Sequence, residues 1–335
     1  MSRRDTCVNG ARGLEGGRKV EQMPRKIFLG VFGHVAVDTI CTVDSFPAVN
    51  TCEGIIDKRV EFGGTAGNLA FYAANMGVPT SLASFVGSDF PEPYRRHLEA
   101  AGIDLTDLVR VGNARTASII MISDKAHRQI GFVDQGVMLR QNDMKLPRHS
   151  IEDAKIVHVG TGRPGFALRV CRRAKELGKL VAIDPAQELS YVYSAKDFST
   201  IVRLADIFFC NETELGIALK YLRKKKPSDL LAYVDKLIVT LGKRGSRIMT
   251  REGESIDIPP ARPRRVVDTT GAGDAYRAGF YAGMYRRLGL EECGMIASAA
   301  ASFAVESFGG QTDPPSWEEV FKRAFGGVSA RASHR

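Results

Sequence analysis

The chain contains two kinds of apolar and polar pattern. From residue 151 onwards, short apolar runs alternate with segments of helical periodicity at a spacing of roughly 25 residues, which is typical of βα units in a parallel sheet. The continuous apolar run at 27–32 predicts a strand buried on both faces. The chain therefore predicts an α/β fold with a mostly parallel central sheet.

The periodicity also sets the expected bounds of the elements. Strands are expected at 27–32, 80–86, 107–111, 156–159, 180–183, 206–209, 236–240, 246–250 and 255–258, the last two as a hairpin. Helices are expected after the glycine turn at 63–68 and at 91–101, 166–177, 195–204, 212–222, 272–288, 290–306 and 315–324. Ligands of open α/β sheets bind beyond the carboxyl ends of the strands, so polar residues there are functional candidates.

Residues 39–62 and 116–133 have the second kind of pattern. Short runs in both segments alternate apolar and polar residues, which predicts strands with one exposed face. We expect these strands to form a small antiparallel β lid that projects from the main body.

Length and composition fit one large domain. Of the 335 residues, 44% are hydrophobic and 25% charged, as in ordinary globular proteins. We expect this domain at 25–325, a disordered N-terminal extension at 1–24 and a disordered tail at 326–335. No apolar run approaches the ~20 residues needed to cross a bilayer, and the first 22 residues lack the apolar core of an export signal.

Cysteine usage and charge indicate the surroundings and partners. The six cysteines include no C-x-x-C pair, so we expect a reducing cytoplasm and no structural zinc. The net charge of +9 raises nucleic-acid binding as an option, but the basic runs Arg223–Lys226 and Arg262–Arg265 are short and lack interleaved aromatic residues. We expect no nucleic-acid or membrane partner, since a polyanionic small substrate also explains a basic surface.

The segment Asp268–Asp274 carries the strongest chemical signal. It joins a turn of small residues to the start of an apolar helix, where free amides of Gly271, Ala272 and Gly273 and the helix dipole make an anion site. A side chain at Gly273 would stand where a phosphate approaches and would strain a positive φ. Asp274 would repel that anion unless it accepts the proton of an attacking hydroxyl. An ordinary N-cap aspartate is the alternative.

Other strand ends suggest a nucleotide site. Asn211 and Glu214 begin a helix, either as a cap or as holders of the waters of a nucleotide-bound Mg²⁺. Thr240, Gly242 and Gly245 form a strand end and a glycine turn that would lie beside a nucleotide, although the chain has no P-loop spacing.

Two helical serines and two histidines complete the candidates. Ser298 and Ser302 lie in an alanine-rich helix that would let a flat nucleotide ring approach closely, with tight helix packing as the alternative. His34 and His158 lie beside buried strands, and nothing completes a Ser–His–Asp arrangement, so we interpret both as structural or substrate-lining.

The glycine turn at 63–68, the Asn211/Glu214 pair, the 242–245 turn and Asp268–Asp274 occur in an order and spacing that resemble the ribokinase-like (PfkB-type) sugar and nucleoside kinases over residues 25–325. The resemblance implies a three-layer α/β/α sandwich with a lid, Asp274 as catalytic base, and Gly271, Ala272 and Gly273 as the anion hole.

The same resemblance implies further roles. Asp38, Gly64 and Asn68 would grip the sugar hydroxyls, and Asp268 with the Thr270 carbonyl would hold a monovalent cation, with K⁺ as the candidate ion. Mg²⁺ would accompany ATP as co-substrate. The lid of this family often pairs between subunits, which implies a homodimer.

Within the family the chain looks most like the archaeal nucleoside kinases, on the segments 33–38, 158–162, 184–187, and 301–306 with 310–312. We therefore expect ATP-dependent transfer of the γ-phosphoryl group to the 5′-hydroxyl of a ribonucleoside. Thr161 and Gln187, with lid residues 116–121 and Phe132, would form a slot for the base. Arg163 would instead bind a second phosphate.

The alternative substrates are ribose 1-phosphate, fructose, inositol or ribose. A catalytically silent ligand-binding protein on the same fold is a remote alternative.

Overall fold

The computed structural model describes residues 27–126 and 128–326, and its main body is built on a nine-stranded sheet in the order β13-β12-β11-β10-β9-β8-β1-β4-β5. The pairings from β5 to β11 are parallel, and β12 and β13 add antiparallel strands at one edge. The predicted mostly parallel sheet is confirmed. The strands are β1 (Leu29–Phe32), β4 (Thr80–Val86), β5 (Leu108–Arg110), β8 (Ile156–Val159), β9 (Leu180–Ile183), β10 (Ile207–Asn211), β11 (Lys236–Thr240), β12 (Ser246–Thr250) and β13 (Ser255–Ile258).

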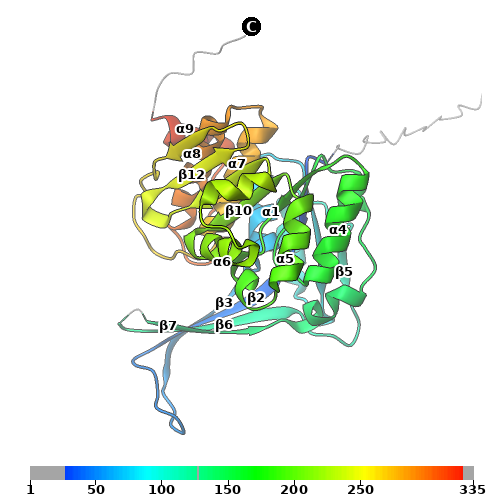
Figure 1. Cartoon of the computed structure of the whole chain (residues 1–335). Coiled ribbons are helices and arrows are strands. Elements are labelled where there is room, and N and C mark those ends of the chain that lie inside the picture. Colours follow the sequence, from blue (N-terminus) through cyan, green and yellow to red (C-terminus); the bar gives the residue numbers. More distant parts are fainter. Residues whose placement is uncertain (1–26, 127, 327–335) are drawn as a thin grey trace, which may run out of the picture.

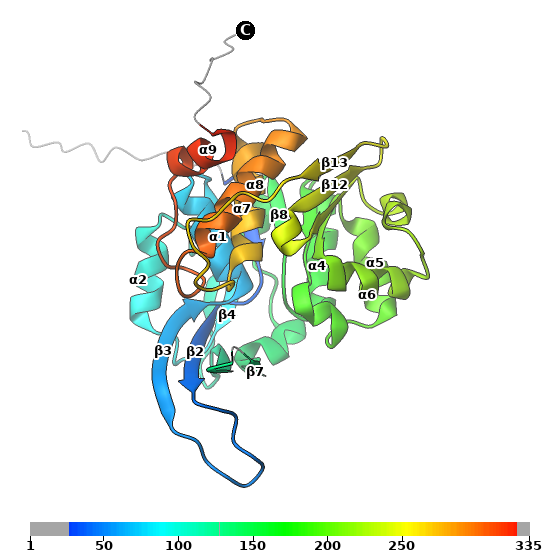
Figure 2. The same cartoon turned by 90° about the vertical axis from the view of Figure 1, so that its left-hand side faces the viewer.

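Helices cover both faces of this sheet, which gives the predicted three layers (Figures 1 and 2). On β10, Ile207 and Phe209 pack toward the helices at 65–75, 272–285 and 290–304, whereas Phe208 and Cys210 pack toward the helices at 164–176, 195–201 and 212–222. Successive residues of the strand point to opposite faces of the sheet, and both faces are buried under helices. This explains why the strands are continuous apolar runs in the sequence.

The helices begin and end close to their expected bounds. They are α1 (Thr65–Asn75), α2 (Glu92–Ala100), α3 (His149–Glu152), α4 (Pro164–Glu176), α5 (Ala195–Ile201), α6 (Glu212–Leu222), α7 (Ala272–Tyr285), α8 (Leu290–Ala304) and α9 (Trp317–Phe325). Short 3₁₀ turns are η1 (Gly136–Asp143), η2 (Ala186–Ser190), η3 (Val202–Leu204), η4 (Pro227–Ala232) and η5 (Gly242–Arg244). Among the described residues, no helix is both long and apolar enough to span a membrane.

The lid is a separate four-stranded sheet that projects from the main body (Figure 1). Its order is β3-β2-β6-β7, with β2 (Ala36–Val43), β3 (Ile55–Gly63), β6 (Ala117–Asp124) and β7 (Gln129–Asp134). The outer pairings are antiparallel, as predicted, but β2 and β6 pair parallel in the centre. The lid therefore consists of two antiparallel pairs that lie side by side.

One local expectation needs correction. The helix expected at 272–288 ends at Tyr285, where the chain turns into α8. The extension at 1–24 lies outside the described residues, as does the tail beyond residue 326, so both disorder expectations stay predictions.

Candidate active site

Polar residues from distant parts of the chain meet at the carboxyl edge of the main sheet. Because β1, β8, β9, β10 and β11 are parallel neighbours, the residues at their ends share this edge. They are Gly33 and His34 after β1, Thr161 after β8, Asp184 after β9, Asn211 at the end of β10 and Thr240 at the end of β11.

The start of α7 is the predicted anion site, a role that stays a prediction, and its two glycines differ in their surroundings. Gly271 is the N-cap residue, with a φ of 76°, and a Cβ there would stand 2.9 Å from Gly310 Cα. The positive φ therefore belongs to Gly271, and the expectation of one at Gly273 was wrong. A Cβ at Gly273 would instead stand 3.0 Å from Arg277 Nη1. Gly273 is exposed at the helix start, so its amide is open to a ligand.

Asp274 is buried in the first turn of this helix, and both of its carboxylate oxygens have partners. Asn68 Nδ2 donates to Oδ2 over 2.9 Å, and Arg277 Nη1 donates to Oδ1 over 3.0 Å. Burial raises the pKa of Asp274 to about 7, against the Asn68 hydrogen bond, with Asp38 and Glu214 raising it further. A carboxyl with this pKa suits a general base near neutral pH.

Arg277 is a site residue that the sequence interpretation missed. Its side chain lies between two carboxylates, with Nη1 on Asp274 and Nε on Asp184, and it is 13% exposed. Asp184 also accepts the Ala186 amide in a turn where Ala186 has a φ of 49°. An arginine within the apolar α7, three residues after Asp274, is the signal that could have found it.

A chain of hydrogen bonds holds Asn68 from its other side. Gln311 Nε2 donates to Asn68 Oδ1 over 3.1 Å and lies 2.5 Å from the Tyr94 hydroxyl, which donates to the Gly63 carbonyl over 2.6 Å. Gln311 and Tyr94 were also missed as site residues. The network fixes the Asn68 amide so that its NH₂ group faces Asp274.

Asp38 lies on lid strand β2, next to the glycine turn before α1. Its Oδ1 is buried without a hydrogen-bond partner, and a Cβ at Gly63 would lie within van der Waals overlap of Oδ2. Burial, with a contribution from Glu61, raises the pKa of Asp38 to about 7. Gly64, the N-cap of α1, has a φ of 86°. Asp38 and Gly64 thus flank Gly63, and Asn68 lies one helical turn after Gly64, while the binding of sugar hydroxyls by these three residues stays a prediction.

The candidates for nucleotide binding lie along the neighbouring strand ends. Asn211 and Glu214 form a capping box, in which the Asn211 amide donates to Glu214 Oε2 and the Glu214 amide donates to Asn211 Oδ1. Burial raises the pKa of Glu214, and its charge also acts on Asp274. Thr240 is the register partner of Asn211 across β10 and β11. The cap and a ligand role are compatible, and the ligand role stays a prediction.

The remaining nucleotide candidates differ in their surroundings. A Cβ at Gly242 would meet open space, whereas one at Gly245 would collide with the Ile258 carbonyl. Ser298 Oγ accepts from the Ala261 amide and donates to the Pro259 carbonyl. Ser302 Oγ donates to the Ala299 carbonyl and accepts from Arg323. Gly245 and both serines thus have structural partners, and their contact with a nucleotide stays a prediction.

The predicted cation residues lie at the entry to α7. Asp268 Oδ1 accepts from the amide and the hydroxyl of Thr270, and Oδ2 accepts from the Gly309 amide over 3.0 Å. Among the described residues, no group of three or more histidine, cysteine or acidic side chains is placed to hold a metal ion.

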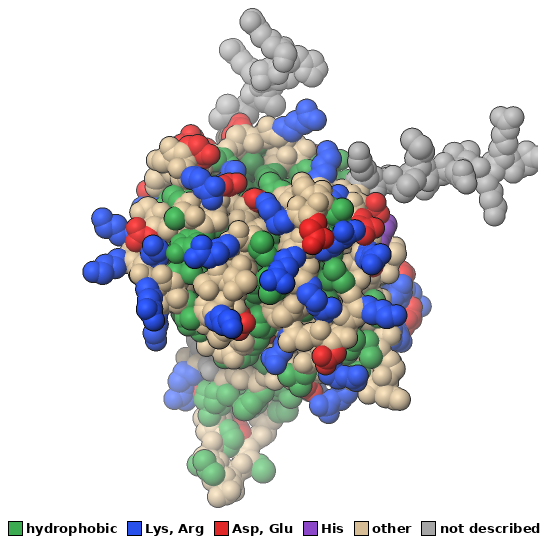
Figure 3. All heavy atoms as spheres, turned by 45° about the vertical axis from the view of Figure 1, so that its right-hand side comes forward, with side chains coloured by type: hydrophobic (Ala, Val, Ile, Leu, Met, Phe, Trp, Pro, Cys, Tyr) green, Lys and Arg blue, Asp and Glu red, His purple; other side chains and the backbone are tan. Residues whose placement is uncertain are grey.

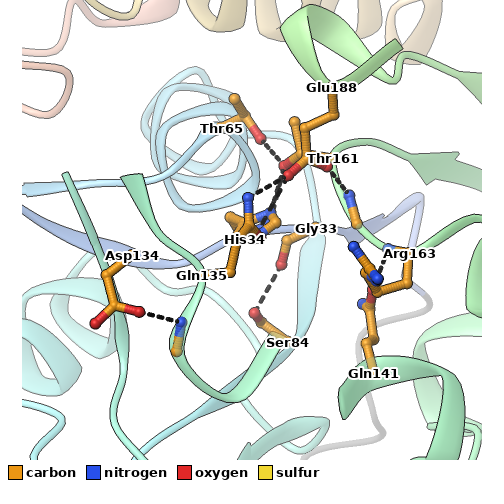
Figure 4. A network of polar contacts seen from close by, with 12 residues as sticks. Gly33, His34, Thr65, Ser84, Asp134, Gln135, Gln141, Thr161, Arg163 and Glu188 are labelled. Atoms are coloured by element: carbon orange, nitrogen blue, oxygen red, sulfur yellow. Dashed lines mark hydrogen bonds and ion pairs between the residues drawn. The ribbon is translucent and has the colours of Figure 1, made fainter. Parts of the chain in front are cut away.

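A pocket opens between the lid and the ends of β1, β8 and β9. Thr161, Gln187 and His34 line it, together with lid residues Ile119 and Val133. Phe132 lies outside this lining, as does Arg163, whose backbone amide donates to Gln141 Oε1 (Figure 4). His158 lies elsewhere, buried against the Tyr281 hydroxyl at 2.8 Å, which fits its structural interpretation.

Comparison with known proteins gives three findings. Residues 26–317 match the model of the pfkB family of carbohydrate kinases. The chain is 38% identical over 299 residues to a nucleoside kinase of Methanothermobacter thermautotrophicus, with 87% of this chain and 93% of that protein covered.

Two solved structures share the fold. The nucleoside kinase of Methanocaldococcus jannaschii, an archaeal member of the ribokinase family, has a TM-score of 0.83 and 36% identity, covering 88% of this chain and 97% of that one. The nucleoside kinase of Burkholderia thailandensis in complex with inosine has a TM-score of 0.79 and 25% identity, covering 89% and 97%.

Proposed function

Because the chain belongs to the pfkB family of carbohydrate kinases, we propose that it is an ATP-dependent nucleoside kinase, which transfers the γ-phosphoryl group to the 5′-hydroxyl of a ribonucleoside. The similarity to nucleoside kinases over most of the chain supports the substrate class. The observation that carries the chemistry is Asp274, a buried carboxylate at the amide-lined start of α7 and held by Asn68. The protein is thus a phosphotransferase that acts on a hydroxyl group.

In this proposal Asp274 accepts the proton of the 5′-hydroxyl as the oxygen attacks the γ-phosphorus. Phosphoryl transfer has a loose transition state, so the protein contributes mainly alignment and compensation of negative charge. Asn68 and Arg277 each hold one oxygen of Asp274, which fixes the direction of its remaining lone pairs. The Gly273 amide, exposed at the start of α7, would face the charge that develops on the phosphoryl oxygens, whereas the Ala272 amide donates to the Thr269 carbonyl over 3.3 Å.

Asn211, Glu214, Thr240 and Gly242 would bind the ATP side of the site. The buried Glu214 carboxylate near Asp274 fits a bound cation, and Mg²⁺ commonly retains waters and phosphate oxygens as ligands. When bound with ATP, Mg²⁺ supplies positive charge across the phosphates. Asp268 and Thr270 would hold a K⁺ ion, and the cysteine usage supports a reducing cytoplasm as the proposed location.

Gly273 and Gly271 offer a matched pair of alanine substitutions. Gly273→Ala is expected to lower turnover about tenfold or more with little change in Tm, because its Cβ meets only the end of the Arg277 side chain and the approaching phosphate. Gly271→Ala should lower both turnover and Tm, since it combines a positive φ with contact to the Gly310 backbone. Steady-state kinetics and thermal unfolding of both variants check this. Equal losses of Tm would indicate a purely structural role for Gly273.

Arg277 is expected to act as a positioning residue for Asp274. Arg277→Met removes the cation beside Oδ1, so the pKa of Asp274 should rise and the acid limb of the turnover–pH profile should move to higher pH. Turnover of Arg277→Met at pH 7 should fall about tenfold and recover in part at pH 9. Turnover of Arg277→Lys should lie between that of wild type and that of Arg277→Met. An unchanged acid limb in a folded Arg277→Met variant would contradict this role.

We propose a homodimer that forms through the lid. Large apolar side chains are exposed on its strands, and Figure 3 shows apolar residues on this projection. They are Ile55, Ile56, Val60, Ile120, Ile130, Phe132 and Val133. Exposed apolar side chains on a projecting sheet are typical of an interaction surface.

The dimer is tested by light scattering after size-exclusion chromatography. Ile56→Asp should shift the mass from two chains to one, whereas Leu139→Asp, equally exposed but outside the lid, should leave it unchanged. A wild-type mass of one chain at micromolar concentration would rule the dimer out.

The proposed function itself is tested by transfer of labelled γ-phosphate from ATP to a panel of acceptors. Inosine, guanosine, cytidine and adenosine are compared with ribose, fructose, inositol and ribose 1-phosphate. At least one nucleoside should give the highest kcat/KM. If a sugar or sugar phosphate has a kcat/KM tenfold above that of every nucleoside, the substrate is a sugar and not a nucleoside. No transfer to any acceptor would favour a catalytically silent binding protein.

A further inference from the structure

A buried carboxylate lines the pocket under the lid. Glu188, on the short turn after β9, is 2% exposed and lines the pocket with His34, Gln135 and Thr161 (Figure 4). Its Oε2 accepts the Gly162 amide over 2.5 Å, and its Oε1 accepts Gln135 Nε2 over 2.8 Å. Glu188 has no part in the proposed proton transfer to Asp274.

The hydrogen bonds that start at Glu188 have one consistent direction. A carboxylate can only accept, so Gln135 turns its NH₂ group to Glu188 and its Oε1 to His34 Nε2, which lies 2.7 Å away. His34 Nε2 then donates to Gln135 Oε1, and Nδ1 lies 2.9 Å from the Thr161 hydroxyl oxygen. Thr65 Oγ1 in turn lies 2.7 Å from Thr161 Oγ1. Glu188 therefore orders the polar wall of the pocket.

The charge of this pocket indicates which chemical groups it can bind. Among the described residues, its lining contains Glu188 but no lysine or arginine, and His34 Nε2 lies 3.9 Å from Glu188 Oε1. A phosphate group in this pocket would lie near a buried carboxylate without a lysine or arginine to offset it, which is strongly unfavourable. A neutral group with an N–H donor would instead be attracted, because each carboxylate oxygen has a second lone pair.

The position of the pocket indicates which part of the substrate enters it. Gly64 and Thr65 form part of its lining, at the start of α1. Asn68, one helical turn further on, holds Asp274. A ribose that rests on Gly64 with its 5′-oxygen at Asp274 therefore directs its C1′ substituent away from the phosphates and toward Glu188.

We propose that Glu188, with Gln135 and His34, sets substrate specificity at the C1′ side: the pocket accepts a neutral base that presents an N–H group and rejects a 1-phosphate. The proposal rests on the proposed nucleoside kinase function and adds the residue that separates nucleosides from ribose 1-phosphate. Gln187 and Tyr191, at the exposed rim of the same pocket, complete the contact surface.

The test compares kcat/KM for inosine with kcat/KM for ribose 1-phosphate in wild type and variants. Wild-type activity on nucleosides tests the proposed function by itself. Glu188→Gln should lower the inosine to ribose 1-phosphate ratio at least tenfold, because it removes the charge at nearly constant size. Glu176→Gln, on the exposed face of α4 with a side chain 63% exposed, is the matched control and should leave the ratio unchanged.

A second variant covers the case in which Glu188→Gln does not fold, since the introduced amide would point its NH₂ group at a neighbouring N–H. Tyr191→Arg adds a cation at the exposed rim and leaves Glu188 in place. It should raise kcat/KM for ribose 1-phosphate about tenfold and affect inosine little. If Glu188 had a merely structural role, its substitution would lower kcat/KM for all substrates in proportion. An unchanged ratio of inosine to ribose 1-phosphate in folded Glu188→Gln, or in Tyr191→Arg, therefore overturns the proposal.

Discussion

Replacement of Asp274 by asparagine is expected to lower turnover at least about 100-fold while ATP still binds. Asparagine keeps the size of the side chain but cannot take the proton of the 5′-hydroxyl. The proposed anion site at the start of α7 uses backbone amides, which the substitution leaves in place. Turnover by stopped assay and ATP binding by calorimetry measure the two effects separately.

The pH profile gives the same claim a second readout. Asp274 works only when ionised, and burial raises its pKa to about 7, so wild-type turnover should fall as the pH drops below about 7. Asp257→Asn, on β13 with a side chain 68% exposed, is the matched control and should keep both the rate and the profile. An Asp274→Asn variant that retained a third of wild-type turnover would remove Asp274 from the proton transfer.

Ribonucleosides are expected to exceed 2′-deoxyribonucleosides at least about 100-fold in kcat/KM. Asp38 Oδ1 is buried without a partner, so a substrate hydroxyl that donates to it removes the cost of an unsatisfied acceptor. A deoxy substrate leaves that acceptor unpaired, and the penalty appears as lost transition-state binding.

Asp38→Ala serves as the internal control for this second prediction. Without the carboxylate, the ribonucleoside should show a higher KM and a lower kcat together, and the ratio of ribo- to deoxyribonucleoside should fall toward one. If wild type treats both sugars alike, Asp38 is not part of the sugar site.

The sequence could predict features that depend on neighbouring residues. Buried strands, helix periodicity and the turn at 268–274 are local, and the structure has them within a few residues of the expected bounds. The capping box of Asn211 and Glu214 was also predictable, because its two members are three residues apart. The parallel pairing of β2 with β6 was not, because alternation along a strand does not give the direction of its neighbour.

The contacts that complete the site join residues that are far apart in the chain. Asn68 and Asp274 are separated by 206 residues, and Gln311 and Asn68 by 243. His34 meets Gln135 across 101 residues, and Gln135 meets Glu188 across 53. The sequence indicates Asn68 and Asp274 individually but not their contact, and it offers no local motif for Gln135 or Glu188. Their roles follow from the fold, which brings the carboxyl ends of distant strands and the lid together.

The most direct test of the central claim is the identity of the product formed from ATP and a ribonucleoside. Phosphorus NMR of a reaction with the best nucleoside should show one nucleoside monophosphate for each ADP, with the new phosphorus coupled to the two H5′ protons. Formation of ADP without a nucleoside phosphate, or a phosphate on any oxygen other than O5′, would contradict the account.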